Sequence, residues 1–249
     1  MKKGLIILQA RTRSSRLPGK NLMLINNKPM IKWQIDRIQK ANVGHLLVAT
    51  TTSHSDDDFV EFLAKNNVDF FRGNEKNVFQ RFKDIVSLYE PDYFIRLTGD
   101  CPLVMPDLLI EMNELFTQGN FDYLSNTLEP TFPDGLDVEI VSTDAFCSLS
   151  NFNLNSQHLE HVTLGFHDYR DNFRIFNFQS SVDLSNLRWT VDYFEDFIFV
   201  NNVFSFFRGV ETSFNTEDLL KAIDAGEIQN NIRGGEYRNI ALKLDIGEN

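Results

Sequence analysis

Cysteine is scarce in this 249-residue chain, which contains only Cys101 and Cys147. They stand far apart and form no CxxC pair, so the sequence indicates neither a disulfide framework nor a zinc site. No apolar run reaches the length of a membrane-spanning helix. The apolar stretch after Lys3 ends at Gln9, which is too short for the hydrophobic region of a signal peptide. We therefore expect a cytoplasmic protein without a membrane partner.

Several motifs that indicate a common chemistry are also missing. The chain has no GxGxxG dinucleotide fingerprint and no GxSxG nucleophile elbow. A P-loop would need glycine at position 14 and serine or threonine at position 21, where Ser14 and Asn21 stand. His158 and His161, in HLEHVT, are closer together than the histidines of HExxH, so a zinc protease is unsupported. For His158 we expect a surface or hydrogen-bonded histidine.

Acidic residues are absent from the opening of an otherwise acidic chain. The first 35 residues contain eight lysines and arginines, and no acid precedes Asp36. The whole chain carries −11, so the remainder carries −19 once the +8 of the opening is set apart. This acidity argues against nucleic acid as a partner, whereas a local positive site favours a small anionic ligand.

The cations concentrate in residues 9–21, QARTRSSRLPGKN, directly after the apolar run GLIIL. Ser14, Pro18 and Gly19 disfavour a regular helix and favour a bent loop. Backbone N–H groups and serine hydroxyls can bind phosphate oxygens while arginine and lysine neutralise the charge. The stretch therefore predicts a polyphosphate site, with a solvated basic loop as the alternative. Its cations are Arg11, Arg13, Arg16 and Lys20.

Apolar runs and amphipathic segments alternate along the first half of the chain. We expect strands over 4–10, 46–51, 69–72 and 93–97, and helices over 30–41, 56–66, 78–89 and 106–117. This alternation implies right-handed crossovers and a mainly parallel sheet, with ligands at the carboxyl ends of its strands. The basic loop and Asp100 both follow a predicted strand.

The alternation becomes irregular after Asp122. We expect a loop over 126–137, strands over 138–141, 173–178 and 187–191, and helices over 143–149, 195–207 and 216–225. The apolar stripe of residues 197–207 is assigned to the core, and a homodimer interface is its alternative. No repeat or linker interrupts the chain. The sequence thus predicts one α/β domain over residues 1–249, with helices on both faces of the sheet.

Two acids follow predicted strands and are candidate metal ligands. Asp100 ends the strand in RLTGDCP, and Asp192 ends another in RWTVDYFED. Mg²⁺ typically takes one or two carboxylates together with phosphate oxygens, so two acids beside a cationic loop favour a magnesium–polyphosphate site. Helix or turn capping is the alternative for both acids.

The segment FPDGLDVEI brings further acids close together. Asp137 and Glu139 share a face if the segment is an alternating strand. Their spacing does not demand a particular chemistry, and a solvated strand face is the alternative to a functional role.

With these residues identified, the chain resembles a known family. QARTRSSRLPGKNL is similar to the loop of the cytidylyltransferases that make CMP-activated sugar acids, the CMP-Kdo and CMP-sialate synthetase group. The likeness is strongest to the spore coat polysaccharide biosynthesis protein F branch. It extends in order from about Leu5 to Asn202, through FRGNEKNVFQRF, RLTGDCPLVMPDLL, YLSNTLEPTFPDGLDVEI, EHVT and LRWTVDYFEDFIFV.

The resemblance implies a nucleotide-diphospho-sugar transferase fold and roles for particular residues. Arg11, Arg16 and Lys20 would hold the phosphates of CTP, and Asp100 and Asp192 would bind Mg²⁺. Of these, Arg11, Lys20 and Asp100 would be catalytic. The other nucleotide-binding residues it implies are Ser14, Arg72, Gly73 and Arg81.

The acceptor pocket is the part of the family pattern that this chain matches least. The resemblance places Asp137, Glu139 and His161 at the acceptor. The pocket residues of the Kdo and sialate enzymes do not recur here position by position, so the resemblance does not identify the acceptor of this chain.

The implied reaction moves CMP from CTP to a small acidic acceptor and releases pyrophosphate. Two alternatives remain. A glycosyltransferase of related fold would normally present a DxD metal motif, whereas residues 99–102, GDCP, offer a single acid. A non-catalytic nucleotide-binding protein would not need both the cationic loop and two candidate metal ligands.

Overall fold

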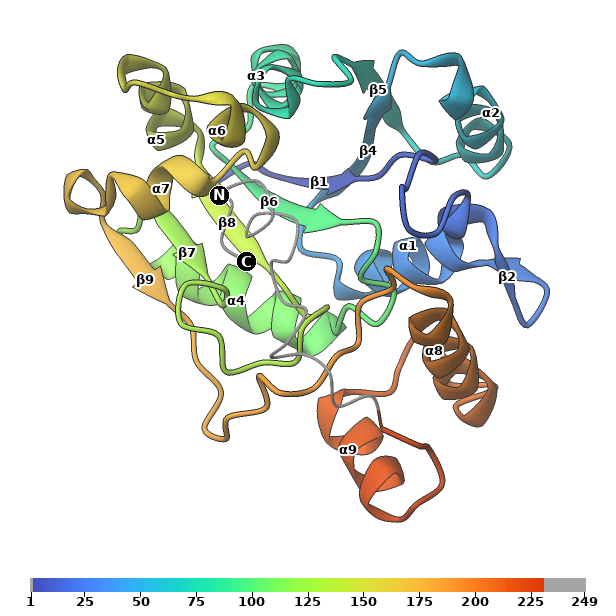
Figure 1. Ribbon diagram of the computed structural model, residues 1–249. Helices are drawn as coiled ribbons and strands as arrows, with labels where there is room; N and C mark the ends of the chain where they lie inside the picture. The colour runs from blue at the N-terminus through green and yellow to red at the C-terminus, as the bar shows by residue number, and fades with distance from the viewer. Residues whose placement is uncertain (1, 231–249) are drawn as a thin grey trace.

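The computed structural model describes residues 2–230, so residues 231–249 of the predicted domain lie outside the described part of the chain. A seven-stranded sheet has the order β5-β4-β1-β6-β8-β7-β9 (Figure 1). Its strands are β1 (Gly4–Gln9), β4 (His45–Thr51), β5 (Phe70–Gly73), β6 (Tyr93–Thr98), β7 (Tyr123–Ser125), β8 (Glu139–Ser142) and β9 (Ile175–Asn177). Strand β8 runs antiparallel to β6 and β7, whereas the other neighbouring pairs are parallel. The predicted mainly parallel sheet is confirmed.

Helices cover both faces of this sheet (Figure 1). One core contains residues of α1 (Met30–Ala41), α2 (Asp57–Lys65), α4 (Pro106–Gln118), α8 (Phe194–Phe206) and α9 (Thr216–Asp224). The other contains residues of α3 (Val78–Tyr89), α5 (Thr143–Ser148) and α7 (Leu164–Asp168), and α6 (Ser156–Glu160) contacts α3. Because side chains alternate along a strand, β1 sends Ile6 to the first core and Ile7 to the second.

The predicted core stripe in α8 is confirmed. Phe199, Val200, Val203 and Phe204 are buried, and Trp33 of α1 stacks on Phe204 with ring centroids 5.2 Å apart. Helices α1 and α3 begin and end at the predicted residues. Their apolar positions recur with the helical period, and this local signal also fixes their boundaries.

The predicted strand over 187–191 is wrong. Only an isolated parallel bridge joins Arg188 to Asp134, and Val191 donates its N–H to the Asp100 carbonyl at 2.7 Å. The segment therefore pairs at single points with two loops and is not a strand of the seven-stranded sheet. Gly135 permits this approach: its φ is +109°, and a Cβ there would stand 2.4 Å from the Thr190 nitrogen.

The sequence analysis also missed short elements. They include helix α7, the hairpin of β2 (Leu24–Ile25) and β3 (Lys28–Pro29), and strand β7, whose three residues are too few for a periodic pattern. Across residues 2–230, none of the helices combines the length and the apolar character that crossing a bilayer requires.

Candidate active site

The basic loop leaves β1 at the carboxyl edge of the sheet and is anchored there by Asp56. Thr12 donates its backbone N–H to Asp56 Oδ1 at 2.9 Å and its hydroxyl to the same oxygen at 2.5 Å. Asp56 Oδ2 accepts from the Thr50 and Thr51 hydroxyls of β4. Burial alone would raise the pKa of Asp56, but hydrogen bonds from threonines hold it below its usual value. The carboxylate therefore stays ionised and fixes the start of the loop.

Glycine closes the loop onto itself. Gly19 has φ +73°, in the left-handed region, and donates its N–H to the Thr12 carbonyl at 3.1 Å. Asn21 then donates its side-chain amide to the Arg11 carbonyl at 3.0 Å. These bonds hold the loop in shape, and Lys20, which lies between the two bonded residues, is buried.

Lys20 joins the loop to two acids that are distant in the sequence. Its Nζ lies 3.2 Å from Asp192 Oδ1 and 3.8 Å from Asp100 Oδ2. It also donates to the Val191 carbonyl at 2.5 Å, and Arg16 reaches Asp192 Oδ1 at 2.8 Å. Two of the predicted cations, Arg16 and Lys20, therefore meet both predicted acids at one place, whereas Arg13 pairs with Glu75.

Asp192 is fixed by cations on both of its oxygens. Arg188 donates to Asp192 Oδ2 at 3.0 Å and also pairs with Asp134 and Asp196. Burial would raise the pKa of Asp192, but Lys20 and Arg16 lower it below the ordinary value. The carboxylate is therefore ionised and shared among three cations.

Asp100 is held through its backbone instead of its side chain. Its carbonyl accepts the Val191 N–H at 2.7 Å and the Thr190 hydroxyl at 3.1 Å. The Asp100 side chain is 33% exposed against 13% for Asp192. A Cβ on the preceding Gly99 would stand 2.7 Å from the Ala10 Cβ, so glycine lets the end of β6 approach the start of the loop. The Asp100 carboxylate thus faces the cavity.

Neither acid caps the helix that follows it. The N-cap of α4 is Met105, and that of α8 is Tyr193, whose capping box uses Asp196. Helix capping is therefore removed as the alternative for both acids, whereas Asp100 does lie in the turn that follows β6.

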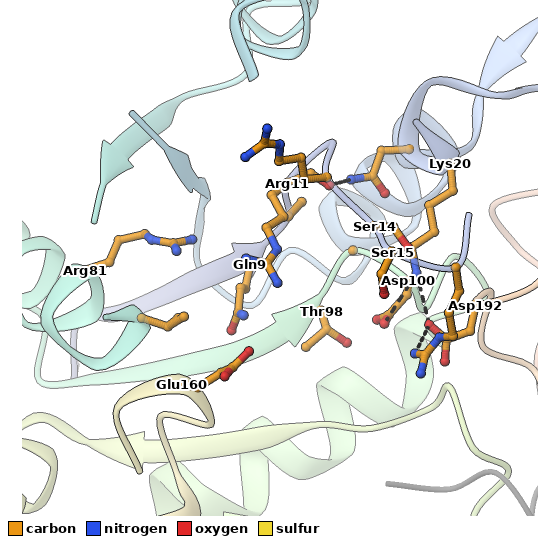
Figure 2. Close-up of a pocket in the computed structure, with 16 residues that line it drawn as sticks. Gln9, Arg11, Ser14, Ser15, Lys20, Arg81, Thr98, Asp100, Glu160 and Asp192 are labelled. Atoms are coloured by element: carbon orange, nitrogen blue, oxygen red, sulfur yellow. Dashed lines mark hydrogen bonds and ion pairs between the residues drawn. The ribbon is translucent and has the colours of Figure 1, made fainter. Parts of the chain in front are cut away.

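These groups line a cavity of about 460 Å³ at the carboxyl ends of β1 and β6 (Figure 2). In Figure 2 Lys20, Asp100 and Asp192 gather on one side, and Gln9 and Glu160 lie on the other, with Thr98 between. We name Arg16, Lys20, Asp100 and Asp192 the loop end, and Gln9, Thr98 and Glu160 the sheet end. The predicted site residues in the lining are Arg11, Ser14, Arg16, Lys20, Arg81, Asp100 and Asp192.

Arg81 forms part of the cavity wall and is almost entirely buried. Its guanidinium donates to the Asn74 carbonyl at 2.8 Å, and its pKa is lowered to about 10, chiefly by burial and then by the charge of Arg11. A Cβ on Gly73 would stand 2.6 Å from the Arg81 Cγ, so Gly73 makes room for this side chain. Arg72 is not among the lining residues, because it bonds the Thr51 and Ser53 carbonyls and Asp57.

The three predicted acceptor contacts do not line this cavity. Asp137 lies near enough to Cys101 to contribute to the raised pKa of that thiol, after burial and Asp100. His161 is the C-cap residue of α6, which ends at Glu160. His158 is buried and takes part in the capping box of that helix with Asn155, as the hydrogen-bonded alternative predicted.

Glu139 is enclosed within the polar part of the sheet. Its carboxylate pairs with Arg96 and accepts from the Tyr123 hydroxyl at 2.5 Å and the Thr163 hydroxyl at 2.6 Å. Burial would raise its pKa, but Arg96 and the two hydroxyls lower it below the ordinary value. The Glu139 carboxylate is therefore bonded to partners inside the protein, and this placement does not support the predicted acceptor contact.

Sequence reasoning missed the sheet end. Gln9 and Thr98 are the last residues of β1 and β6 in the structure, and the end of a strand is a signal for a ligand contact. Glu160, next to His161 in HLEHVT, carried no comparable signal, because only the packing of α6 beside α3 brings it over the sheet.

The donor set suits a hard divalent cation whose coordination is completed by a ligand. Asp100 and Asp192 both border the ammonium of Lys20, and no group of three or more His, Cys, Asp or Glu side chains within residues 2–230 is arranged to hold a metal. Two carboxylates with phosphate oxygens are a usual environment for Mg²⁺. The residues therefore fit a metal that binds together with a polyphosphate.

Comparisons with known proteins agree with this geometry. A family model described as cytidylyltransferase matches residues 5–202. The spore coat polysaccharide biosynthesis protein SpsF of Bacillus subtilis is 32% identical over 179 residues, which cover 69% of this chain and 72% of that protein. An Escherichia coli 3-deoxy-manno-octulosonate cytidylyltransferase is 35% identical over 107 residues, 43% of each chain.

Solved structures extend the likeness to the fold. A cytidylyltransferase from Leptospira borgpetersenii superposes with a TM-score of 0.86 at 30% identity, covering 91% of this chain and 96% of that one. A CMP:2-keto-3-deoxy-manno-octonic acid synthetase in complex with CTP has a TM-score of 0.62 at 18% identity, covering 82% and 98%. The second likeness shows the fold alone.

Proposed function

The chain belongs to the cytidylyltransferase family of nucleotidyltransferases, and we propose that it transfers CMP from CTP to an acidic sugar or related acceptor. The transfer releases pyrophosphate and serves the synthesis of a surface polysaccharide or glycan. One observation carries the proposal: Arg16 and Lys20 of the basic loop and two distant acids converge at one end of a cavity, inside the segment that matches the family. The relatives named for polysaccharide biosynthesis and for sugar-acid activation support the pathway.

The reaction needs positioning and charge neutralisation. An acceptor oxygen forms a bond to the α-phosphorus, the bond from that phosphorus to the bridging oxygen breaks, and pyrophosphate leaves with the electron pair. The acceptor hydroxyl loses its proton to solvent, which balances the step. Arg16 and Lys20 belong to the loop end, where they stabilise the charge that develops on the departing phosphates. Arg11 lines the same cavity and adds a further positive charge.

Magnesium is part of the proposal. Asp100 and Asp192 would hold the ion, which supplies charge neutralisation at the phosphates when bound. Asp100 is the more exposed of the two acids, so its side chain would need to move less than that of Asp192 to bind the ion. Asp192 pairs with Arg16 and Lys20. A divalent ion that shared its carboxylate would make these two cations available to the phosphates.

The test is pyrophosphate release with CTP, Mg²⁺ and a panel of sugar acids, neutral sugars and other hydroxylated acids. We expect release with CTP and at least one member of the panel. CTP should also raise the melting temperature more than ATP, GTP or UTP at equal magnesium, since a ligand that binds the folded state stabilises it. Equal stabilisation by the four nucleotides would contradict the choice of cytidine, and absence of release across the panel would contradict the transfer.

A further inference from the structure

A row of polar side chains crosses three neighbouring strands behind the cavity. We define the polar row as Gln9 of β1, Arg96 of β6 and Glu139 of β8. Arg96 and Glu139 are directly paired in the antiparallel register of β6 and β8. Phe94 and Val141, two positions from them along their strands, belong to the core covered by α3, α5 and α7, and Ile7, two before Gln9, does too. The row therefore lies on one face of the sheet, at the margin of that core.

The guanidinium of Arg96 is held in place by the carboxylate of Glu139. Glu139 pairs with it and accepts from Tyr123 and Thr163, so this carboxylate is held by three donors. The Arg96 side chain is 14% exposed and the Glu139 side chain 8%. A buried ion pair that is hydrogen-bonded on several sides resists rearrangement, because breaking it leaves an uncompensated charge.

Arg96 in turn fixes the amide of Gln9. Its Nε and one terminal nitrogen lie 3.3 Å and 3.2 Å from Gln9 Oε1. A guanidinium only donates, so the oxygen of the amide must face Arg96 and the NH₂ group must face away from it. Gln9 lines the cavity, where this NH₂ group is a donor of fixed direction.

The position of Gln9 distinguishes between the two substrates. In an in-line displacement the attacking oxygen approaches the α-phosphorus opposite the departing pyrophosphate. The cations proposed to receive pyrophosphate stand at the loop end, and Gln9 stands across the cavity from Lys20 (Figure 2). Glu160 at the same sheet end repels phosphate but accepts hydrogen bonds from hydroxyl groups. The acceptor is therefore the substrate that fits beside Gln9.

We propose that Gln9 donates its side-chain N–H to an oxygen of the acceptor, and that Arg96, held by Glu139, is the positioning residue that sets this direction. The inference rests on the proposed function. It deepens that function by assigning an acceptor-selective contact to a residue at the end of β1, outside the cation cluster.

The test measures pyrophosphate release at saturating CTP, with the panel member that the wild-type protein uses best, and CTP affinity by calorimetry. Gln9→Met keeps the length of the side chain and removes the donor. We expect it to raise the KM for the acceptor about tenfold, the worth of a typical hydrogen bond, and to leave the Kd for CTP within about twofold. Gln39→Met, on the exposed part of α1, is the matched control and should change neither value.

Arg96→Lys tests the positioning role. Lysine keeps a positive charge beside Glu139 but lacks the fork that reaches Gln9 Oε1 with two nitrogens. We expect a higher KM for the acceptor in the wild-type background and no further increase when Arg96→Lys is added to Gln9→Met. This non-additivity is expected when one residue acts through the other, whereas a purely structural effect of Arg96 would add.

Three results would overturn the inference: an unchanged acceptor KM in Gln9→Met, an equal loss of CTP affinity, or additive effects of the two substitutions. Absence of pyrophosphate release by the wild-type protein with every panel member is a different failure. It would overturn the proposed function, and this inference with it.

Discussion

The two ends of the cavity balance their charges differently. At the loop end Asp192 is shared by Arg16, Lys20 and Arg188, and Lys20 is shared in turn with Asp100. In the polar row behind the sheet end, Glu139 has Arg96 as its cation and two hydroxyls as further donors. Shared pairs can exchange partners when a charged ligand enters, whereas a buried single pair cannot. The loop end is therefore suited to receive charge, and the sheet end is suited to hold a fixed shape.

The largest expected effect tests the fixed side of this comparison. Glu139→Leu leaves the Arg96 guanidinium without its carboxylate, and we expect a loss of about 3–5 kcal/mol in the free energy of unfolding. Urea unfolding measures it. Glu217→Gln, which breaks an exposed pair with Lys221 on α9, is the control and should leave stability unchanged. If both variants behave alike, the polar row is not a buried pair.

The next effect separates the two acids of the loop end. Asp100→Asn and Asp192→Asn should each reduce CTP-dependent pyrophosphate release by about 10²-fold or more, roughly 2.7 kcal/mol of transition-state stabilisation. Asparagine keeps one oxygen but loses the charge that a hard cation prefers. Asp192→Asn should also lower the melting temperature, because Arg16, Lys20 and Arg188 each lose one anionic partner, and Asp100→Asn should not. Near-wild-type turnover of both variants at limiting magnesium would remove the catalytic assignment.

A smaller effect tests whether the loop end receives the triphosphate. Lys20→Ala should weaken CTP binding by ~1.5–3 kcal/mol, the usual worth of a charge-assisted hydrogen bond. Calorimetry at fixed magnesium measures the affinity, with Lys40→Ala at the exposed end of α1 as the control. Unchanged affinity in a folded Lys20→Ala protein would separate the basic loop from the nucleotide site.

The smallest effect is a pH dependence of the unfolding free energy that arises from His167 of α7. Burial lowers the pKa of His167 below its ordinary 6.5, although Glu139 and Asp168 oppose the shift. The unfolded chain therefore binds a proton more readily than the folded protein, and stability falls as pH decreases below about 6.5. We expect His167→Asn to flatten the dependence of unfolding free energy on pH between about 7 and 5.5. An identical slope in both proteins would contradict the shift.

Much of the fold followed from local pattern. Helices α1 and α3 have the predicted ends because their apolar residues repeat with the helical period and each element depends mainly on its own sequence. The strand predicted over 187–191 is wrong for the opposite reason. Its apolar residues resemble those of a strand, but its pairing depends on Gly135 and Asp100, which are distant in the sequence. Burial alone makes such a segment apolar, with or without a strand.

The chemistry of the loop end can be read without a structure: a run of cations follows a buried strand, and Asp100 follows another. Which groups meet depends on how the chain packs. Lys20 and Asp192 are 172 residues apart, and Gln9 and Arg96 are 87 apart. Their partners are set by the order and register of the strands, which arise from packing of the whole sheet. A single sequence records the types of residue at each strand end, but the order β1-β6-β8 places Gln9, Arg96 and Glu139 in one row.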